Sequence, residues 1–203
     1  MQTQQRYYTP AEYLELEEKA ESKSEYIDGQ IFPMAGGSIN HNRICGNLYI
    51  ALSLALRQQN YEAFIGDVRL WIPDKQVYTY PDVMVIEGKP NYYNNRTDTL
   101  TNPVVIAEVL SKSTQGYDRQ AKFADYRTIG CFQEYLLIDQ NRLYVEHYAK
   151  TGAKRWEFQQ YDVEDEVISL TSIPFQISLI DLYNKVNFDL GNSEAQTDAS
   201  RSD

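Results

Sequence analysis

One acidic residue interrupts an otherwise apolar segment near the middle of the chain. Residues 104–110 read VVIAEVL, and Glu108 is the charged residue among them. A run of this kind is typical of a strand that is buried on both faces. A buried carboxylate loses hydration worth several kcal/mol, so it requires a cation, a hydrogen-bond donor or a proton as its partner. Glu108 is therefore a candidate site residue, although a Glu that ends a strand and pairs with an Arg gives the same pattern.

A second carboxylate opens the preceding strand-like segment. Asp82 follows Pro81, which favours an extended chain, and precedes apolar residues 83–86. Taken alone, Pro-Asp before a strand is most often part of a turn. If Asp82 and Glu108 lie on neighbouring strands, however, they repel, raise each other's pKa and offer oxygen ligands for Mg²⁺ or Mn²⁺.

The segment after Glu108 supplies a candidate cation. Asp118, Lys122 and Tyr126 are spaced four residues apart, so they share one face of a helix predicted over 117–129. A strand, a turn and this helix could fold Lys122 back over the end of the strand. There its ammonium group could orient or deprotonate a metal-bound water molecule, or neutralise a phosphate. The alternative is an exposed helix with an Asp118–Lys122 pair worth only a few tenths of a kcal/mol.

Local signals predict the elements near the N-terminus. Thr9, Pro10 and Glu12 have the pattern of a capping box at the start of a short helix that ends at about residue 20. Asp28-Gly29 lies between two short β-prone runs and therefore predicts a hairpin.

The remaining segments alternate between helical and strand periodicity. Residues 38–60 carry apolar side chains at spacings of three and four, which is typical of a helix with one buried face. We expect a loop over 88–102, strands at 63–72, 82–87, 104–110 and 134–139, an antiparallel meander over 143–148, 155–161 and 167–170, and a short helix at 178–186. This order predicts a mixed α/β (α+β) fold with helices on the faces of a sheet.

Length and charge limit the domain organisation and the function classes. The 203 residues suit one domain, over 1–188, followed by a polar tail over 189–203 whose composition predicts disorder. With 19 Lys+Arg against 29 Asp+Glu, the formal net charge is −10. This balance argues against a protein that coats nucleic acid through general basicity, although it leaves room for a local basic groove.

No membrane or secretion signal stands out in the sequence. The longest apolar-rich run, 44–56, contains polar residues and is shorter than the ~20 residues that a bilayer requires. The first ten residues have no apolar core of a signal peptide. We therefore expect a cytoplasmic protein.

Cysteine and histidine are scarce. Cys45 and Cys131 lie far apart, outside any CxxC or Cys/His cluster, so the spacing indicates neither zinc nor a disulfide, and we expect both side chains to be buried. His41 and His147 are too few for a His-ligated metal site or a Ser-His-Asp hydrolase. We expect any metal to be held by oxygen ligands.

Several short motifs occur together in an order that resembles a known family. They are Pro81-Asp82, EVLS at 108–111, Lys122 and Tyr126, and EYLLID at 134–139, with EYIDG at 25–29 upstream. This set resembles the Uma-two family of restriction endonuclease-like proteins, which belongs to the PD-(D/E)XK nuclease superfamily. The resemblance covers roughly residues 7–188.

The resemblance implies a restriction endonuclease-like fold, in which helices flank a central mixed β-sheet, and a divalent metal site. Asp82 and Glu108 are the implied ligands of Mg²⁺ or Mn²⁺, and the carbonyl of Val109 is implied to complete the metal's ligands. Glu25 matches the family's upstream acidic position and is implied to contact the metal through water.

The resemblance also implies a lysine that positions water for phosphodiester hydrolysis. In the superfamily this lysine normally stands two residues after the acid, where the present chain has Leu110. Lys122 matches a position on the following helix, and Lys112 is its rival.

Four further residues are candidate substrate contacts. His41 resembles a His of the family's corresponding helix and could contact a phosphate or orient Glu25, although surface and capping roles are commoner. Ser111 could donate to a phosphate, although capping the next helix is its commoner role. Lys112 and Tyr126 complete this set.

Together with these observations, the resemblance implies a metal-dependent DNA endonuclease with Asp82, Glu108, Lys122 and Glu25 as its catalytic residues. Its partner would be DNA, and two copies related by two-fold symmetry would suit a double-strand cut. One alternative is a non-catalytic module that keeps the nuclease fold and binds nucleic acid or protein, and the net charge and the apolar Leu110 favour it. Another is a hydrolase of nucleotides or small ligands that uses the same carboxylates, which would require a closed pocket in place of an open groove.

Overall fold

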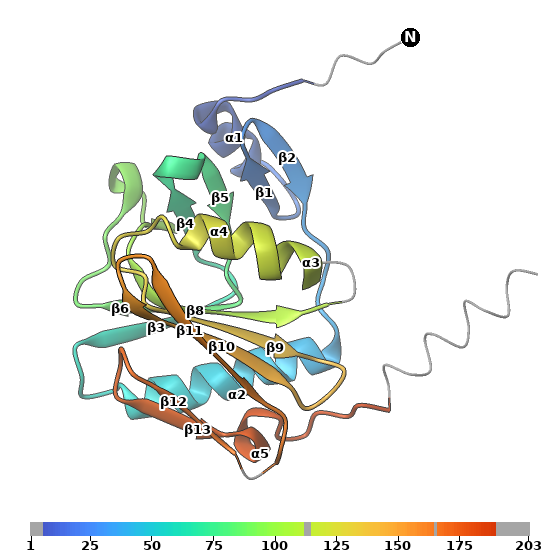
Figure 1. Cartoon of the computed structure of the whole chain (residues 1–203). Helices are drawn as coiled ribbons and strands as arrows, with labels where there is room; N and C mark the ends of the chain where they lie inside the picture. The colour runs from blue at the N-terminus through green and yellow to red at the C-terminus, as the bar shows by residue number, and fades with distance from the viewer. Residues whose placement is uncertain (1–5, 112–114, 165, 190–203) are drawn as a thin grey trace, which may run out of the picture.

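The computed structural model describes residues 6–111, 115–164 and 166–189, and its largest sheet has six strands (Figure 1). In spatial order these are β11 (Arg155–Tyr161), β10 (Val145–Gly152), β9 (Glu134–Asp139), β8 (Pro103–Leu110), β6 (Val83–Glu87) and β3 (Tyr61–Ile65). β8 and β9 run parallel, whereas the other neighbours run antiparallel. The predicted mixed sheet is therefore confirmed.

Helices cover both faces of this sheet (Figure 1). α2 (Ile39–Ala55) lies on one face, where Ile44, Leu48 and Leu52 belong to the same apolar core as residues of β6 and β8. The opposite face carries α3 (Gln115–Tyr117), the π-helical segment η3 (Asp118–Lys122) and α4 (Phe123–Tyr126).

The strand β8 divides its side chains between these two cores. Val105 and Val109 pack on the α2 side, whereas Ile106 and Leu110 pack on the α4 side, as expected for alternating strand residues. Glu108 shares the parity of Ile106 and Leu110, so its side chain points toward η3 and α4.

A second sheet lies above the first in Figure 1, beside the N-terminal helix α1 (Pro10–Glu17). Its order is β2 (Gln30–Pro33), β1 (Ser24–Ile27), β5 (Val77–Thr79), β4 (Arg69–Ile72) and β7 (Thr99–Leu100). Both predicted local signals are present, because Thr9 forms a capping box with Glu12 and the β1–β2 turn has positive φ at Asp28 and Gly29. An aromatic cluster of Tyr13, Tyr26, Trp71 and Tyr78 forms the core of this region.

The structure divides one predicted strand in two. The segment predicted as a strand over 63–72 forms β3 and β4, which belong to different sheets. Gly66 lies between them with a φ of 65°, a left-handed conformation that lets the chain leave one sheet for the other. The predicted loop over 88–102 contains the short helix η2 (Tyr93–Asn95) and β7, and β5 follows another short helix, η1 (Pro73–Lys75).

The C-terminal part of the predicted meander is also wrong. β12 (Val167–Leu170) does not join β11 but pairs with β13 (Phe175–Ser178) in a separate two-stranded sheet, followed by α5 (Leu179–Leu182). Cys131 is exposed, contrary to the prediction that both cysteines are buried.

Two further predictions lie wholly or mainly outside the described residues. Lys112 is one, and the polar tail beyond Asp189 is the other. Among the helices that the structure describes, none is long and apolar enough to cross a membrane.

Candidate active site

The pairing of β6 with β8 brings the two candidate metal ligands together. In this antiparallel register Val83 lies opposite Ala107, so Asp82, which immediately precedes β6, and Glu108 of β8 lie next to the last pair of the ladder. The strands β6 and β8 are therefore neighbours, as the hypothesis of a carboxylate pair assumes.

Both carboxylates line one cleft of about 520 Å³. The acidic residues Glu25 and Asp118 also line it, together with Lys122. Another wall is residues 33–38, the segment that joins β2 to α2. The cleft thus combines groups from both large sheets and from helices on both faces of the central sheet.

Lys122 lies at the centre of the acidic groups. Its Nζ atom is 3.2 Å from Glu108 Oε1, 3.4 Å from Glu25 Oε1 and 3.4 Å from Asp118 Oδ1. Burial alone would lower the pKa of Lys122, but the charges of these three carboxylates raise it well above its ordinary value. Lys122 is therefore a fixed ammonium group, already placed beside the carboxylates.

Glu108 is buried and held from a second side by Tyr126. The Tyr126 hydroxyl donates a 2.6 Å hydrogen bond to Glu108 Oε1, the same oxygen that faces Lys122. Burial raises the pKa of Glu108 to about 8, because it and the charges of Asp82 and Asp118 outweigh the nearby ammonium. The ionised form of Glu108 is therefore destabilised in the metal-free protein, and an additional cation beside it would stabilise that form.

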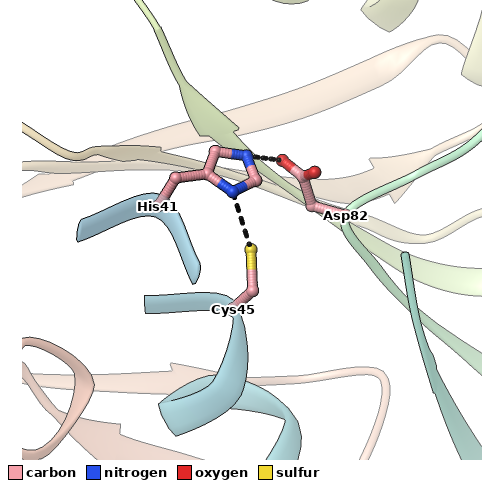
Figure 2. A group of neighbouring side chains, drawn as sticks. All are labelled: His41, Cys45 and Asp82. Carbon is pink, nitrogen blue, oxygen red and sulfur yellow. Dashed lines mark hydrogen bonds and ion pairs between the residues drawn. The ribbon is translucent and has the colours of Figure 1, made fainter. Parts of the chain in front are cut away.

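Asp82 is held by a backbone donor and by a histidine. Its Oδ2 atom accepts a 2.7 Å hydrogen bond from the backbone N–H of Val109 and lies 3.1 Å from His41 Nε2. Figure 2 shows the His41 ring between Asp82 and Cys45, whose Sγ atom is 3.6 Å from His41 Nδ1. Burial alone would lower the pKa of His41, but its hydrogen bond with Asp82 and the Asp82 charge raise it.

Glu25 reaches the site from the second sheet. The Thr79 hydroxyl donates a 2.5 Å hydrogen bond to Glu25 Oε1, which also faces Lys122. His41 was suggested as a residue that could orient Glu25, but in the structure it bonds Asp82 instead.

The remaining sequence candidates lie in different places. Ser111 lines the cleft. Tyr126 has no exposed surface and does not line the cleft, so its contact with Glu108 makes it a residue that positions the carboxylate. Lys112 lies outside the described residues.

Sequence reasoning missed the partners that complete the site. Cys45 stands four residues after His41 on the predicted helix, a spacing that places both on one face and could have indicated a pair. Thr79 carried no comparable signal, because β5 was not predicted. Asp118 was expected only as a helical partner of Lys122, yet it also lines the cleft.

The composition of the site fits a hard divalent cation. Four carboxylates, those of Glu25, Asp82, Glu108 and Asp118, face the ammonium of Lys122 and one imidazole. When all these groups are ionised, two negative charges remain uncompensated. Carboxylate oxygens are the ligands that Mg²⁺ and Mn²⁺ prefer, so Asp82 and Glu108 are suited to hold such an ion.

Relatives are known from both sequence and structure. The chain is 52% identical over 148 residues to the uncharacterised protein sll1609 of Synechocystis, a match that covers 73% of this chain and 84% of that protein. It is 34% identical over 180 residues to slr1290 of the same organism, covering 89% and 93% of the two chains.

A solved structure shares the fold. It is the crystal structure of a "putative nuclease belonging to DUF820" from Anabaena variabilis, which superposes with a TM-score of 0.73 at 22% identity and covers 89% of this chain and 99% of the other. Residues 10–182 match the model of the Uma2 family, described as "Putative restriction endonuclease". This match spans most of the chain, and the chain therefore belongs to the Uma2 family.

Proposed function

We propose that the protein is a metal-dependent DNA endonuclease that hydrolyses phosphodiester bonds in the cleft between Asp82 and Glu108. The observation that carries the proposal is the position of Lys122, whose ammonium group is buried among the carboxylates of Glu25, Glu108 and Asp118. Membership of the Uma2 family, described as "Putative restriction endonuclease", supports the same reaction class.

Asp82 and Glu108 would hold Mg²⁺ or Mn²⁺, with the carbonyl of Val109 as a further ligand. When bound, such an ion supplies a Lewis acid that activates water and offsets phosphate charge. The backbone N–H of Val109 and the ring of His41 fix the Asp82 carboxylate in place, while the Tyr126 hydroxyl fixes that of Glu108.

Lys122 would donate hydrogen bonds to the attacking water or to a phosphate oxygen. Its charge is retained across the neutral pH range, because the surrounding carboxylates raise its pKa. The role therefore differs from that of a general base, because the ammonium group orients the water and neutralises phosphate charge without giving up a proton. Glu25 and Asp118 hold the ammonium in its position.

The substrate in this proposal is DNA, and residues 1–188 act as one nuclease domain. A single site of this kind cuts one strand at a time. Two copies related by a two-fold axis would present two sites to the two antiparallel strands, so a homodimer is part of the proposal for double-strand cleavage.

The test is the cleavage of supercoiled plasmid in Mg²⁺ or Mn²⁺ by the wild type and by Glu108→Gln, purified in parallel. We expect metal-dependent nicking or linearisation by the wild type and none by the variant. The parallel variant controls for a contaminating nuclease, since a contaminant would cut equally in both preparations. Absence of cleavage by the wild type across supercoiled, linear and single-stranded DNA would contradict the proposal.

A non-catalytic binding module with the same fold is the second candidate. The net charge of −10 and Leu110 at the superfamily's usual lysine position favour it. The two candidates differ in what Lys122→Gln changes: a nuclease loses turnover while its affinity for DNA changes little, whereas a module with no turnover changes in affinity alone.

A further inference from the structure

The His41 side of the cleft has a different chemistry from the Glu108 side. Besides Asp82, it offers an imidazole nitrogen and a thiol sulfur, and one ligand atom from each of His41, Cys45 and Asp82 lies within 4.8 Å of the other two. Figure 2 shows the three side chains converging from α2 and from the residue before β6. Nitrogen and sulfur are poor ligands for Mg²⁺ but good ones for ions of the zinc class.

We propose that His41, Cys45 and Asp82 form a second metal site, which binds one borderline divalent cation such as Zn²⁺, Co²⁺ or Cd²⁺. No part of this proposal requires the protein to cleave DNA.

One ligand atom from each residue lies within 4.8 Å of the other two, so side-chain adjustment would bring the three to the spacing of one tetrahedral ion. Zinc binds sulfur at about 2.3 Å and nitrogen or oxygen at about 2.0–2.2 Å, so two ligands of one tetrahedral ion lie roughly 3.5 Å apart. His41 Nδ1 and Cys45 Sγ are 3.6 Å apart, and His41 Nε2 and Asp82 Oδ2 are 3.1 Å apart. Only one nitrogen of the His41 ring can bind a given ion. Binding therefore replaces either the Nδ1–Cys45 contact or the Nε2–Asp82 contact with a bond to the metal.

Backbone geometry fixes the three ligands before any ion arrives. His41 and Cys45 are four residues apart on α2, so one helical turn holds them on the same face. Asp82 is anchored by the backbone N–H of Val109. His41 and Asp82 line the cleft, so an ion can enter from that side and keep a water molecule as its fourth ligand.

The thiol must lose its proton to bind the ion. Burial raises the pKa of Cys45, so Cys45 is a neutral thiol in the metal-free protein. Binding therefore releases a proton, and affinity rises with pH. A buried neutral thiol that becomes a metal-bound thiolate gives a distinct optical signal.

The experiment is a titration of the full chain with Co²⁺ under reducing, chelator-free conditions, followed by absorption spectroscopy. We expect a thiolate-to-cobalt charge-transfer band that saturates at one equivalent and disappears when Zn²⁺ displaces the cobalt. Cys45→Ser should lose the band. Cys131→Ser, which changes the exposed cysteine, should keep it.

Asp82→Asn provides a variant that leaves the buried thiol untouched, in case Cys45→Ser folds poorly. Loss of this ligand should weaken the cobalt affinity by about tenfold or more, on the scale of changes to residues that support metal sites. The proposal is overturned if the wild type shows no thiolate band at one equivalent, or if the band depends on Cys131 instead of Cys45.

One consequence rests on the proposed function. Because Asp82 belongs to both sites, an ion bound to Cys45 would compete with Mg²⁺, and low Zn²⁺ would inhibit DNA cleavage in a manner that excess Mg²⁺ relieves. The cobalt spectrum requires no cleavage, so failure of the proposed nuclease activity and failure of this metal site are separately visible.

Discussion

At the scale of single residues, Lys122 forms ion pairs with three acidic residues of the site. Its ammonium group is the buried partner of three carboxylates, and its side chain is only 10% exposed. Removing one partner of a buried ion pair typically costs 3–5 kcal/mol, because the remaining charges stay buried without compensation. Lys122 is therefore expected to contribute to stability and, in the proposed function, to the chemistry of the site.

We predict that Lys122→Gln loses at least about 10²–10³-fold in cleavage rate, the scale expected when one preorganised donor to a transition state is removed. The midpoint of thermal unfolding should also fall. Lys75→Gln is the matched control, since Lys75 pairs with Asp125 at a more exposed position. Plasmid cleavage under single-turnover conditions measures the first effect; full activity in Lys122→Gln would transfer the role to Lys112 or another cation.

A glycine beside the cleft limits where the His41 ring can lie. A Cβ atom at Gly37 would be 2.9 Å from His41 Nδ1, whereas a Cβ at Gly36 would meet nothing within 4 Å. The ring is the end of a flexible side chain, so it can move away at little cost to the fold. Gly37→Ala should therefore displace the ring from Asp82.

We predict that Gly37→Ala returns the pKa of His41 toward its ordinary value of about 6.5, because the contact with Asp82 that raises this pKa is weakened. NMR titration of the ring protons measures the change, and the chain has only two histidines to assign. Gly36→Ala is the control and should leave the titration unchanged. An unchanged pKa in Gly37→Ala would show that the ring tolerates the methyl group where it stands.

The sequence predicts which residue types form the site better than it predicts which of these residues contact one another. Glu108 stands out because a charge in an apolar strand needs a partner, and the spacing of Lys122 and Tyr126 indicates which residues reach it. The contacts of Glu25 with Lys122 and of His41 with Asp82 join distant segments. Such contacts follow from the packing of whole elements, which local periodicity does not specify.

At the scale of elements, a buried carboxylate joins the small C-terminal sheet to the central one. Glu134, the first residue of β9, accepts 2.9 Å hydrogen bonds from the backbone N–H groups of Thr171 and Ser172 in the turn between β12 and β13. Both hydroxyl groups also bond it, and His147 Nε2 lies 3.0 Å away. These hydrogen bonds hold the β12–β13 turn against β9.

We predict that Glu134→Gln lowers the free energy of unfolding by up to about 3 kcal/mol at pH 7. Burial would raise the pKa of Glu134, but its bonds to His147 and Ser172 and to the backbone lower it from 4.5 to about 2. One pKa unit corresponds to about 1.4 kcal/mol. Urea unfolding at pH 7 measures the loss, with Glu157→Gln on exposed β11 as control.

The sign of the pH dependence follows from the lowered pKa. The stabilisation by Glu134 is complete above the unfolded value of 4.5 and is lost as the pH falls from there toward 2. The wild type and Glu134→Gln should therefore converge in stability between pH 4.5 and 2. A constant difference over that range would contradict the assignment.

Elements with a local signal are predictable, and those defined by distant partners are not. The capping box of α1 and the Asp28-Gly29 hairpin depend on residues within a few positions of each other. The division of residues 61–72 between two sheets, and the pairing of β12 with β13, depend on partners elsewhere in the chain. The π-helical segment η3 is likewise invisible in the periodicity of 117–129.

At the scale of the whole molecule, the negative charge of the protein affects its binding of charged ligands. The chain has a net charge of −10, and its cleft gathers four carboxylates. A phosphate group that enters such a cleft meets repulsion, and a bound divalent cation relieves it. Metal binding should therefore stabilise the folded protein and, in the proposed function, precede the binding of DNA.

We predict that Mg²⁺ at ten times its Kd raises the midpoint of thermal unfolding of the wild type by about 3–6 °C. Binding at that concentration contributes about 1.4 kcal/mol, and each kcal/mol shifts the midpoint of a domain of this size by roughly 2–4 °C. Asp82→Asn and Glu108→Gln should lose the shift, because each removes a proposed ligand. Differential scanning calorimetry with and without Mg²⁺ measures it.

Asp125→Asn is the matched control for the metal shift, because Asp125 pairs with Lys75 and does not line the cleft. It should keep the full shift. An equal shift in Asp82→Asn and Glu108→Gln would mean that Mg²⁺ binds elsewhere on the acidic surface. The difference between the control and the two ligand variants therefore separates a metal site from the general attraction of an acidic molecule for divalent cations, which net charge alone would produce.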